Sequence, residues 1–335
     1  MVRDSRPQSG SGAPLVSVLI PVFNQEAYIA DAIRSAQDQT YRHVEILVHD
    51  DGSTDRTGAI VEELAAADPR IRFTRTAHNQ GVAVARNLLI AAARGTYICW
   101  LDADDMMAAD KVMTQCAFLD ANPPFAAVAT ALRPIDAAGR PLRKGGHRRP
   151  GDASARIFVP AFATVTLLYR REALLRAYPL RPLRDGSDFD LVLRVAEGGE
   201  IAEIREALYI RRYHAGQMSR AAASGHIIAV ASNIYRTFGL ADIIDDATIN
   251  EAALLRRILS DRPLLFAAMR NGASDPRLTM NEGWFALVLV LLHTVRRIGT
   301  LGERLGVITE CLRHSPGAFF QVVGFWLRRR LAPPS

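Results

Sequence analysis

The chain has 335 residues, of which 49% are hydrophobic and 23% are charged, and this ordinary globular composition excludes wholesale disorder. Its formal net charge is +6 and its pI is about 9.5, which favours anionic partners such as nucleotide phosphates and acidic lipid surfaces. We expect no nucleic-acid partner, because neither a zinc-finger spacing nor an aromatic-rich basic stripe is visible. The length allows an α/β core of roughly 200 residues and a second unit of about 100.

From residue 15 to about residue 210, short runs rich in β-branched residues alternate with stretches that have apolar side chains at helical spacing. Pro21 is expected to end the first strand, and Ser53 and Asp55 are candidate caps of the second helix. Such alternation predicts an α/β fold with a doubly wound, mostly parallel sheet. In chain order, we predict strands at 15–20, 44–48, 71–73, 96–101, 126–132 and 207–210, and helices through 28–36, 60–64, 83–93, 109–121 and 187–197.

The first of two acidic clusters follows the second predicted strand. Asp50 and Asp51 begin the sequence DDGSTD, and open α/β sheets bind ligands at the carboxyl ends of their strands. A buried carboxylate there can accept the N–H of a pyrimidine ring and a ribose hydroxyl, while Gly52 lets the backbone approach the ligand. A surface turn without a ligand is the alternative.

Two other segments are candidates for nucleotide binding. Pro21, Phe23 and Asn24 close the first strand, where the aromatic ring could line a base pocket and Asn24 could cap the next helix. A purely structural role for these three residues remains an equal alternative. Gly81 and Arg86 lie at the start of the third helix, where the helix dipole and a guanidinium both favour a diphosphate.

The second acidic cluster follows the strand at 96–101. Asp102, Ala103, Asp104 and Asp105 supply the carboxylate oxygens that Mg²⁺ and Mn²⁺ prefer as ligands. Asp102 and Asp104, two residues apart on an extended segment, can share one ion that bridges both phosphates of a leaving group. Most acidic loops bind no metal, and this is the alternative here.

Taken together, these motifs resemble the family 2 glycosyltransferases, and the resemblance covers about residues 15–220. It implies an inverting enzyme with the GT-A fold of nucleotide-diphospho-sugar transferases. The segments that match in order and spacing are 15–24, 50–55, 81–87 and 95–105.

The resemblance also implies roles for individual residues. The residues that match Phe23, Asp51 and Arg86 lie around the nucleotide in that family. Those that match Asp102 and Asp104 form its metal site, known as the DxD motif. The implied cofactor is Mg²⁺ or Mn²⁺, and the implied donor substrate is a nucleotide diphosphate sugar.

A later carboxylate, usually in an ED or GD pair that opens a helix, is the catalytic base of the family. It matches Asp188, although Ser187 stands where Glu is common, and Asp190 is a weaker rival. An inverting transfer needs one general base that faces the acceptor hydroxyl, and a simple helix cap is the alternative role. Arg212 and His214 match the family's closing segment, which approaches the diphosphate or the acceptor; a surface position is the alternative for the histidine.

We take residues 1–14 as a disordered lead-in, 15–222 as the catalytic domain and 223–335 as a helical region that is either membrane-associated or oligomerising. The apolar run 284–292 falls short of the roughly 20 residues that span a bilayer. The aromatic and basic residues at 319–330 fit an interfacial helix on anionic lipid, with a core helix as the alternative.

Two further observations concern surface and compartment. The basic residues at 133–151, set among glycines and prolines, predict a mobile surface loop or a lid over phosphates. Cys99, Cys116 and Cys311 are far apart in apolar surroundings, which predicts buried free thiols in a reducing compartment. No apolar leader is visible, so we expect a cytoplasmic protein that could be peripheral at the inner face of the cell membrane.

The sequence therefore predicts a metal-assisted hexosyltransferase. It would move a sugar from a nucleotide diphosphate, UDP favoured, to an acceptor hydroxyl on a glycan or a lipid-linked precursor in cell-surface glycan synthesis. One alternative is a nucleotidyltransferase, although residues 21–26 lack the Gly-rich basic loop that such an enzyme needs after its first strand. Another is a catalytically silent nucleotide-binding scaffold. The sugar, the acceptor, the linkage and the oligomeric state stay open.

Overall fold

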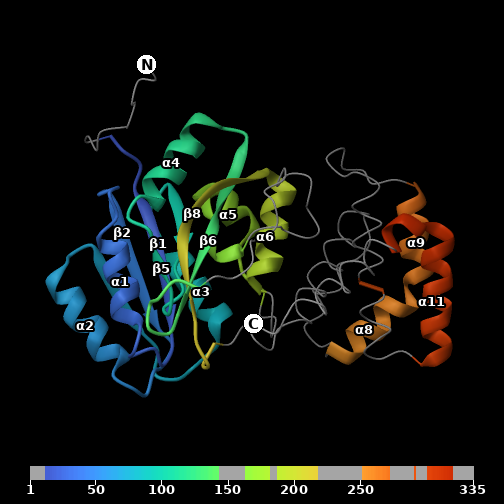
Figure 1. The fold of residues 1–335 in the computed structure, drawn as a ribbon, viewed down its shortest axis with the longest axis horizontal. Coiled ribbons are helices and arrows are strands. Elements are labelled where there is room, and N and C mark those ends of the chain that lie inside the picture. Colours follow the sequence, from blue (N-terminus) through green and yellow to red (C-terminus); the bar gives the residue numbers. More distant parts are fainter. Residues whose placement is uncertain are drawn as a thin grey trace. The chain divides into compact units, whose positions relative to one another are not determined.

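The computed structural model describes residues 12–142, 163–181, 187–217, 251–271, 290–291 and 300–319 (Figure 1). The chain divides into two compact units, each of which is described by itself. The first unit consists of Met1–Ala153, Ala161–Pro182 and Val195–Met218, and the second consists of Ser154–Pro160, Leu183–Arg194 and Ser219–Ser335.

An eight-stranded mixed sheet forms the centre of the first unit, with the strand order β3-β2-β1-β4-β7-β6-β8-β5. Strands β1 to β4 pair in parallel, as do β6 and β8, whereas β7 and β5 run antiparallel to their neighbours. The predicted α/β fold is confirmed, although the sheet is less parallel than expected. The strands are β1 Val16–Val22, β2 Val44–Asp50, β3 Ile71–Arg75, β4 Tyr97–Trp100, β5 Met106–Met107, β6 Phe125–Asp136, β7 Leu168–Arg170 and β8 Glu200–Tyr213.

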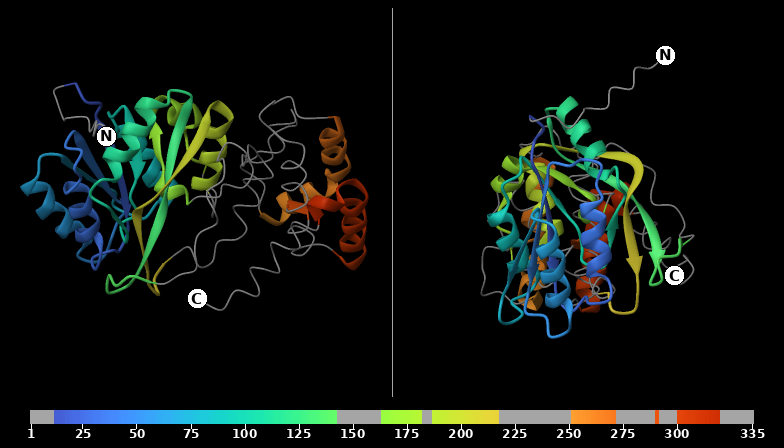
Figure 2. Two further views of the ribbon diagram at one scale, coloured as in Figure 1. Left: turned by 45° about the horizontal axis from the view of Figure 1, so that its top comes forward. Right: turned by 90° about the vertical axis from the view of Figure 1, so that its left-hand side faces the viewer.

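Helices cover both faces of this sheet (Figure 2). The buried residues of α1 recur at the spacing of one helical face, and they pack on alternate side chains of β1 in the main hydrophobic core. Helix α3 contacts β1 and β2. The helices of the first unit are α1 Ile29–Gln37, α2 Thr57–Ala67, α3 Val82–Ala92, α4 Lys111–Ala121 and α5 Arg171–Ala177, with a 3₁₀ turn at Thr164–Thr166. Helix α6 Ser187–Gly198 begins in the second unit and ends in the first.

Pro21 does not end the first strand, because β1 continues through Val22 and pairs Pro21 with His49 of β2. The carbonyl of Leu19 accepts the N–H of Leu101 on the β4 side, whereas the carbonyl of Val22 accepts an N–H on the β2 side. Backbone groups alternate between neighbours, so the nitrogen of Pro21 points toward β4, where the β4 ladder has already ended. The strand therefore loses no hydrogen bond at the proline.

Two of the predicted helix caps are wrong. The Ser53 hydroxyl accepts the N–H of Asn24 at 2.9 Å instead of capping α2. Asn24 adopts a left-handed conformation with φ of 49°, and its side-chain oxygen accepts the N–H of Thr54 at 2.8 Å instead of capping α1. Asp55, in contrast, accepts the N–H of Thr57, the first residue of α2, at 2.9 Å. The bonds of Ser53 and Asn24 join the turn after β1 to the turn after β2.

Several elements differ in extent from the prediction. β6 and β8 are longer than predicted, and the basic loop expected at 133–151 begins only after Asp136; its residues 143–151 lie outside the described part of the chain. Residues 1–11 of the predicted lead-in also lie outside it. The carbonyls of Ala13 and Pro14 lie 2.6 Å from His43 Nδ1 and 2.5 Å from the Tyr41 hydroxyl. All three cysteines are buried and free, as predicted.

The second unit contains α8 Glu251–Ser260, α9 Arg262–Asn271 and α11 Leu301–His314. Arg262 forms an ion pair with Glu310 at 3.1 Å, and the rings of Phe266 and His314 lie 5.1 Å apart, so α9 packs against α11. Within the described residues, no helix combines the length and the apolar character needed to cross a membrane. The apolar run 284–292, apart from residues 290–291, and the tail beyond residue 319 lie outside the described part.

Candidate active site

The second acidic cluster lies directly after β4 and brings three carboxylates together. One oxygen from each of Asp102, Asp104 and Asp105 lies within 4.8 Å of the others. Burial, together with the negative charges of Asp102 and Asp104, raises the pKa of Asp105 to about 8. Such a concentration of hard oxygen ligands and negative charge suits a divalent cation. The two residues predicted to bind metal thus lie together, and Asp105, which the sequence analysis placed in the cluster but not in the metal pair, is their third neighbour.

Positive charges lie around this cluster. The Arg86 guanidinium is 3.3 Å from Asp102 and 5.3 Å from the centre of the Trp100 ring. Burial lowers the pKa of Arg211, but the charges of Asp105 and Asp102 raise it overall. Arg86 and Arg211 thus compensate part of the negative charge of the cluster.

Tyr209 of β8 supports the backbone of the cluster, a contact that was not predicted. Its side chain is fully buried, and its hydroxyl accepts the N–H of Asp102 at 3.1 Å. Burial and the charges of Asp105 and Asp102 raise the pKa of Tyr209 well above its ordinary value, so the phenol stays neutral. A buried tyrosine at alternate spacing in a strand is the ordinary pattern of core packing, and only the tertiary fold shows this contact.

The side chain of Arg212, predicted to approach the diphosphate or the acceptor, is enclosed by protein groups. Its side chain is only 4% exposed, and it donates to the Asp104 carbonyl at 3.1 Å, the Ala137 carbonyl at 3.1 Å and the Asp31 carboxylate at 3.0 Å. Its backbone N–H donates to Asp105 at 2.8 Å. Arg212 is therefore part of the framework of the acidic cluster.

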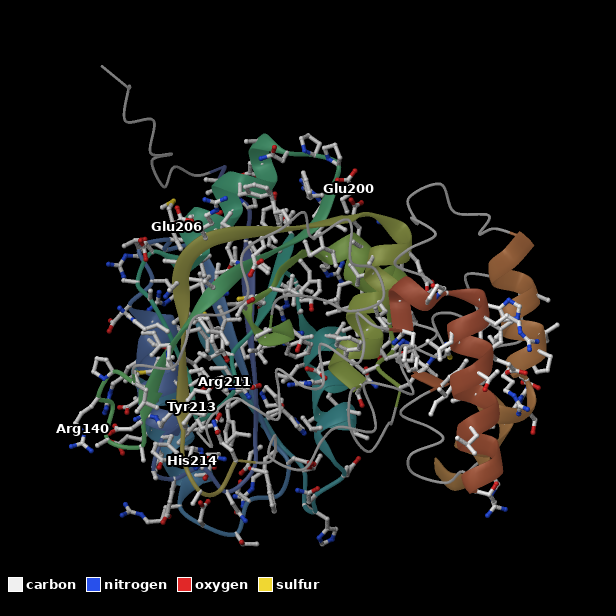
Figure 3. The ribbon with its side chains drawn as sticks, turned by 45° about the vertical axis from the view of Figure 1, so that its right-hand side comes forward. Arg140, Glu200, Glu206, Arg211, Tyr213 and His214 are labelled. Carbon is white, nitrogen blue, oxygen red and sulfur yellow. The ribbon has the colours of Figure 1, made fainter. Side chains whose placement is uncertain are left out.

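His214 lies within the acidic site. Its Nε2 atom is 2.9 Å from an Asp104 carboxylate oxygen. Figure 3 shows His214 with Arg211 and Tyr213 near one end of β8, while Glu200 lies at the opposite end of that strand. The final residues of β8 and the turn that follows therefore form one wall of the cluster.

Asp51 holds the loop that leads into α3. Its carboxylate accepts the N–H groups of Gln80 and Gly81, each at 2.8 Å, and lies 3.2 Å from the Thr76 hydroxyl. Gly81 is the N-cap residue of α3 with φ of 95°, a conformation that favours glycine. Gly52 also needs to be glycine, because an added Cβ would lie 2.7 Å from the backbone carbonyl carbon of His78. Asp51 Oδ1 accepts two of these bonds, whereas Oδ2 accepts only the N–H of Gly81 and keeps a lone pair for a ligand.

Asp50 and the residues that close β1 differ in accessibility. Asp50 has no exposed surface: it accepts the N–H of Ser53 at 2.8 Å and lies 3.2 Å from Arg75 Nε, so it stabilises a turn and presents nothing to a nucleotide. Phe23 is 41% exposed, an unusual exposure for a large apolar ring. Pro21 is half-buried, so Phe23 is the better candidate for contact with a base.

The two candidate bases lie in the first turn of α6. Asp190 is fully buried and forms an ion pair with Arg194 at 2.9 Å along the helix. Asp188 is half-buried at the second position of the helix. This segment belongs to the second unit, whereas the acidic cluster belongs to the first, so the role of Asp188 stays a prediction.

Comparison with known proteins agrees with this geometry. The family model described as Glycosyl transferase family 2 matches residues 17–176, a range that includes both acidic clusters. This stretch is a family 2 glycosyltransferase domain. The family 2 domain also has the GT-A fold: a solved structure of S. aureus TarS 1–349 in complex with UDP-GlcNAc aligns with a TM-score of 0.59. At 19% identity over 87% of this chain and 90% of that one, this likeness concerns the fold alone.

Curated relatives share the family 2 domain as well. A protein of Haemophilus influenzae named uncharacterized glycosyltransferase is 40% identical over 109 residues, which make up 32% of this chain and 44% of that protein. The chondroitin synthase of Escherichia coli is 32% identical over 208 residues, which make up 60% of this chain and 29% of the synthase. The chain thus spans less than half the length of either relative.

Proposed function

We propose that this protein transfers a sugar from a nucleoside diphosphate, with UDP favoured, to an acceptor hydroxyl during the assembly of a cell-surface glycan. The observation that carries the proposal is the set of three carboxylates within 4.8 Å of one another after β4 of a family 2 glycosyltransferase domain. The likeness to a chondroitin synthase supports a glycan acceptor, and the fold shared with TarS, whose structure contains UDP-GlcNAc, supports a UDP donor.

The acidic cluster fits Mg²⁺ or Mn²⁺ by the chemistry of its ligands. Asp102 and Asp104 are partly exposed, with side-chain exposures of 31% and 17%, and would hold the ion. A bound divalent ion supplies positive charge that offsets the charge of a departing diphosphate. Arg86 keeps Asp102 in place through its ion pair, and the neutral Tyr209 hydroxyl fixes the backbone N–H of the same residue.

The nucleotide would bind beside the carboxyl ends of β1 and β2. There, the exposed Phe23 ring offers a flat apolar surface to a base, and Asp51 can accept an N–H or O–H group in addition to the two backbone groups it already binds. Asp51 also orders the start of α3. A change at Asp51 would therefore disturb both the loop and the bound base.

Asp188 is the proposed general base. It would take the proton of the acceptor hydroxyl while that oxygen forms a bond to the anomeric carbon and the bond to the diphosphate breaks, which inverts the configuration. Asp190 is a poorer candidate, because full burial and the ion pair with Arg194 occupy it within the helix.

The test is calorimetric titration of the protein with UDP, with and without Mn²⁺, followed by incubation with a panel of UDP-sugars. We expect UDP binding that depends on Mn²⁺ and release of UDP and sugar by slow hydrolysis in the absence of acceptor. A scaffold would bind UDP and release no sugar. A nucleotidyltransferase would instead produce pyrophosphate from a nucleoside triphosphate and a sugar phosphate, and either result would refute the proposal.

A further inference from the structure

The end of β8 packs against the beginning of α1 through a single aromatic ring. The Tyr28 ring centroid lies 4.8 Å from that of His214, and the Arg212 guanidinium carbon lies 4.8 Å from the same ring. Arg212 and His214 are two residues apart, so in an extended chain their side chains lie on the same side and one ring can contact both. Asp31 forms an ion pair with the same Arg212 at 3.0 Å. It lies three residues after Tyr28, and therefore on the same side of the first turn of α1.

Both residues that contact Tyr28 also bind Asp104. Arg212 Nε donates to the Asp104 carbonyl at 3.1 Å, and His214 Nε2 lies 2.9 Å from the Asp104 carboxylate. The backbone and the side chain of one proposed metal ligand are thus both fixed from the end of β8. Among the described residues, Tyr28 is the aromatic side chain that contacts both of these partners.

We propose that Tyr28 is a positioning residue, which holds His214 against the Asp104 carboxylate and thereby fixes the direction in which Asp104 presents its oxygens to a divalent cation. The inference rests on the metal site of the proposed function. His214 follows the last residue of β8, where the strand no longer restricts its side chain, and packing against a ring removes that freedom. Side chains that hydrogen-bond to a metal ligand orient it, and their loss weakens metal binding.

The direct test is the affinity for Mn²⁺ alone, without nucleotide, measured from the electron paramagnetic resonance signal of the free ion. Tyr28→Leu removes the ring and should weaken Mn²⁺ binding about tenfold. Tyr28→Phe keeps the ring and should bind Mn²⁺ like the wild type. Phe118→Leu is the matched control. It removes a ring whose centroid lies 5.5 Å from that of Phe125, in a different part of the sheet from the acidic cluster, and it should leave the affinity for Mn²⁺ unchanged.

A double-mutant cycle separates positioning from a general loss of structure. If Tyr28 acts through His214, then Tyr28→Leu should weaken Mn²⁺ binding in the wild type and cause no further loss in the His214→Ala background. An equal loss in both backgrounds overturns the inference, and so does an unchanged or tighter affinity of the single variant. Thermal unfolding of each variant shows that it is folded.

The two proposals can fail separately. If the wild type binds Mn²⁺ and the cycle shows no coupling, only the role of Tyr28 is refuted. If the wild type binds no Mn²⁺, the metal site of the proposed function is refuted, and the positioning role is refuted with it.

Discussion

Arg86 connects α3 to the acidic loop after β4 through its ion pair with Asp102 at 3.3 Å. The guanidinium, which is largely buried, also lies over the Trp100 ring at 5.3 Å. A planar guanidinium can stack on a ring and bind a carboxylate at its edge at the same time, which a lysine ammonium cannot reproduce. The pair therefore couples the orientation of Asp102 to the position of α3.

Arg86→Lys should keep the charge and lose this geometry. We expect about tenfold weaker binding of UDP in the presence of Mn²⁺, because the charge-assisted hydrogen bond and the stacking are each worth about 1 kcal/mol or more. Isothermal titration calorimetry measures the change. Arg42→Lys, at an exposed position near the start of β2, is the matched control and should bind UDP like the wild type. Equal affinities of the two variants would contradict the role of Arg86.

Asp104→Ala should abolish the Mn²⁺-dependent part of UDP binding, because it removes a proposed metal ligand from the cluster of three carboxylates. The measurement is titration with UDP in the presence of Mn²⁺ and again in the presence of a chelator. Asp110→Ala removes an exposed carboxylate at the start of α4 that caps no N–H group with its side chain, and it should have no effect. Unchanged UDP affinity in Asp104→Ala would count against the metal assignment.

Asp188→Asn should bind the donor with wild-type affinity and lose transfer, since an amide cannot accept the proton of the acceptor hydroxyl. Loss of a general base typically lowers the rate by about 10²- to 10⁴-fold. The comparison variant is Asp190→Asn, which should chiefly lower the melting temperature because it removes a largely buried ion pair with Arg194. Wild-type turnover in Asp188→Asn, measured as UDP release with acceptor present, would refute its role.

Stability at acid pH should depend on Asp68. Hydrogen bonds from the Arg70 guanidinium, together with that from Gln37, hold the pKa of Asp68 well below its usual value of 3.8. A carboxyl with a lowered folded pKa adds stability above its unfolded pKa, and this stability is lost as the pH falls through the folded value. Asp68→Asn should therefore lower the free energy of unfolding by about 1 kcal/mol at neutral pH, and by less below about pH 4.

Urea denaturation between about pH 7 and about pH 3 tests this expectation. Glu62→Gln changes an exposed carboxyl on α2, the helix that Asp68 directly follows, and should leave the free energy of unfolding within about 0.5 kcal/mol of the wild type. A stability difference between Asp68→Asn and the wild type that stays constant down to the lowest pH would contradict the assignment of the lowered pKa.

Deletion of residues 320–335 tests the proposed membrane contact of the C-terminal region. The deleted segment contains Phe320, Trp326 and three consecutive arginines, and the cut spares the buried Ala318 at the end of the described chain. If the tail is interfacial, the full chain should float with liposomes that contain anionic lipid and the truncated chain should not. Flotation of both proteins, or of neither, would favour a packing role for the tail.

The sequence predicted the first half of the sheet well, because each of its elements carries a local signal. α1 shows four buried residues at one helical spacing, and β1 and β2 are continuous apolar runs. β7 carries no such signal: it has only three residues, and it is a strand because Leu168 pairs with Cys99 of β4. Its position could be found only from the tertiary structure.

The candidate site shows the same limit. The acidic residues could be recognised, because carboxylates after apolar strands are visible in the sequence. The direction of a side chain could not: Arg212 resembles a solvent-exposed arginine, but its partner Asp31 lies 181 residues earlier in the chain. Asp50 and Asp51 are adjacent, and only the sheet shows that Asp50 is sealed inside a turn while Asp51 holds the loop before α3.

Pro21 has a consequence for the edge of the sheet from which the acidic loop leaves. β1 extends three residues beyond Leu19, its last residue paired with β4, so its backbone on that side is not paired with a strand there. Any residue other than proline at position 21 would present a backbone N–H donor on that side of β1. Because proline has no N–H, another strand cannot accept a hydrogen bond from this position. Strand pairing is therefore disfavoured in the space that the acidic loop occupies after β4.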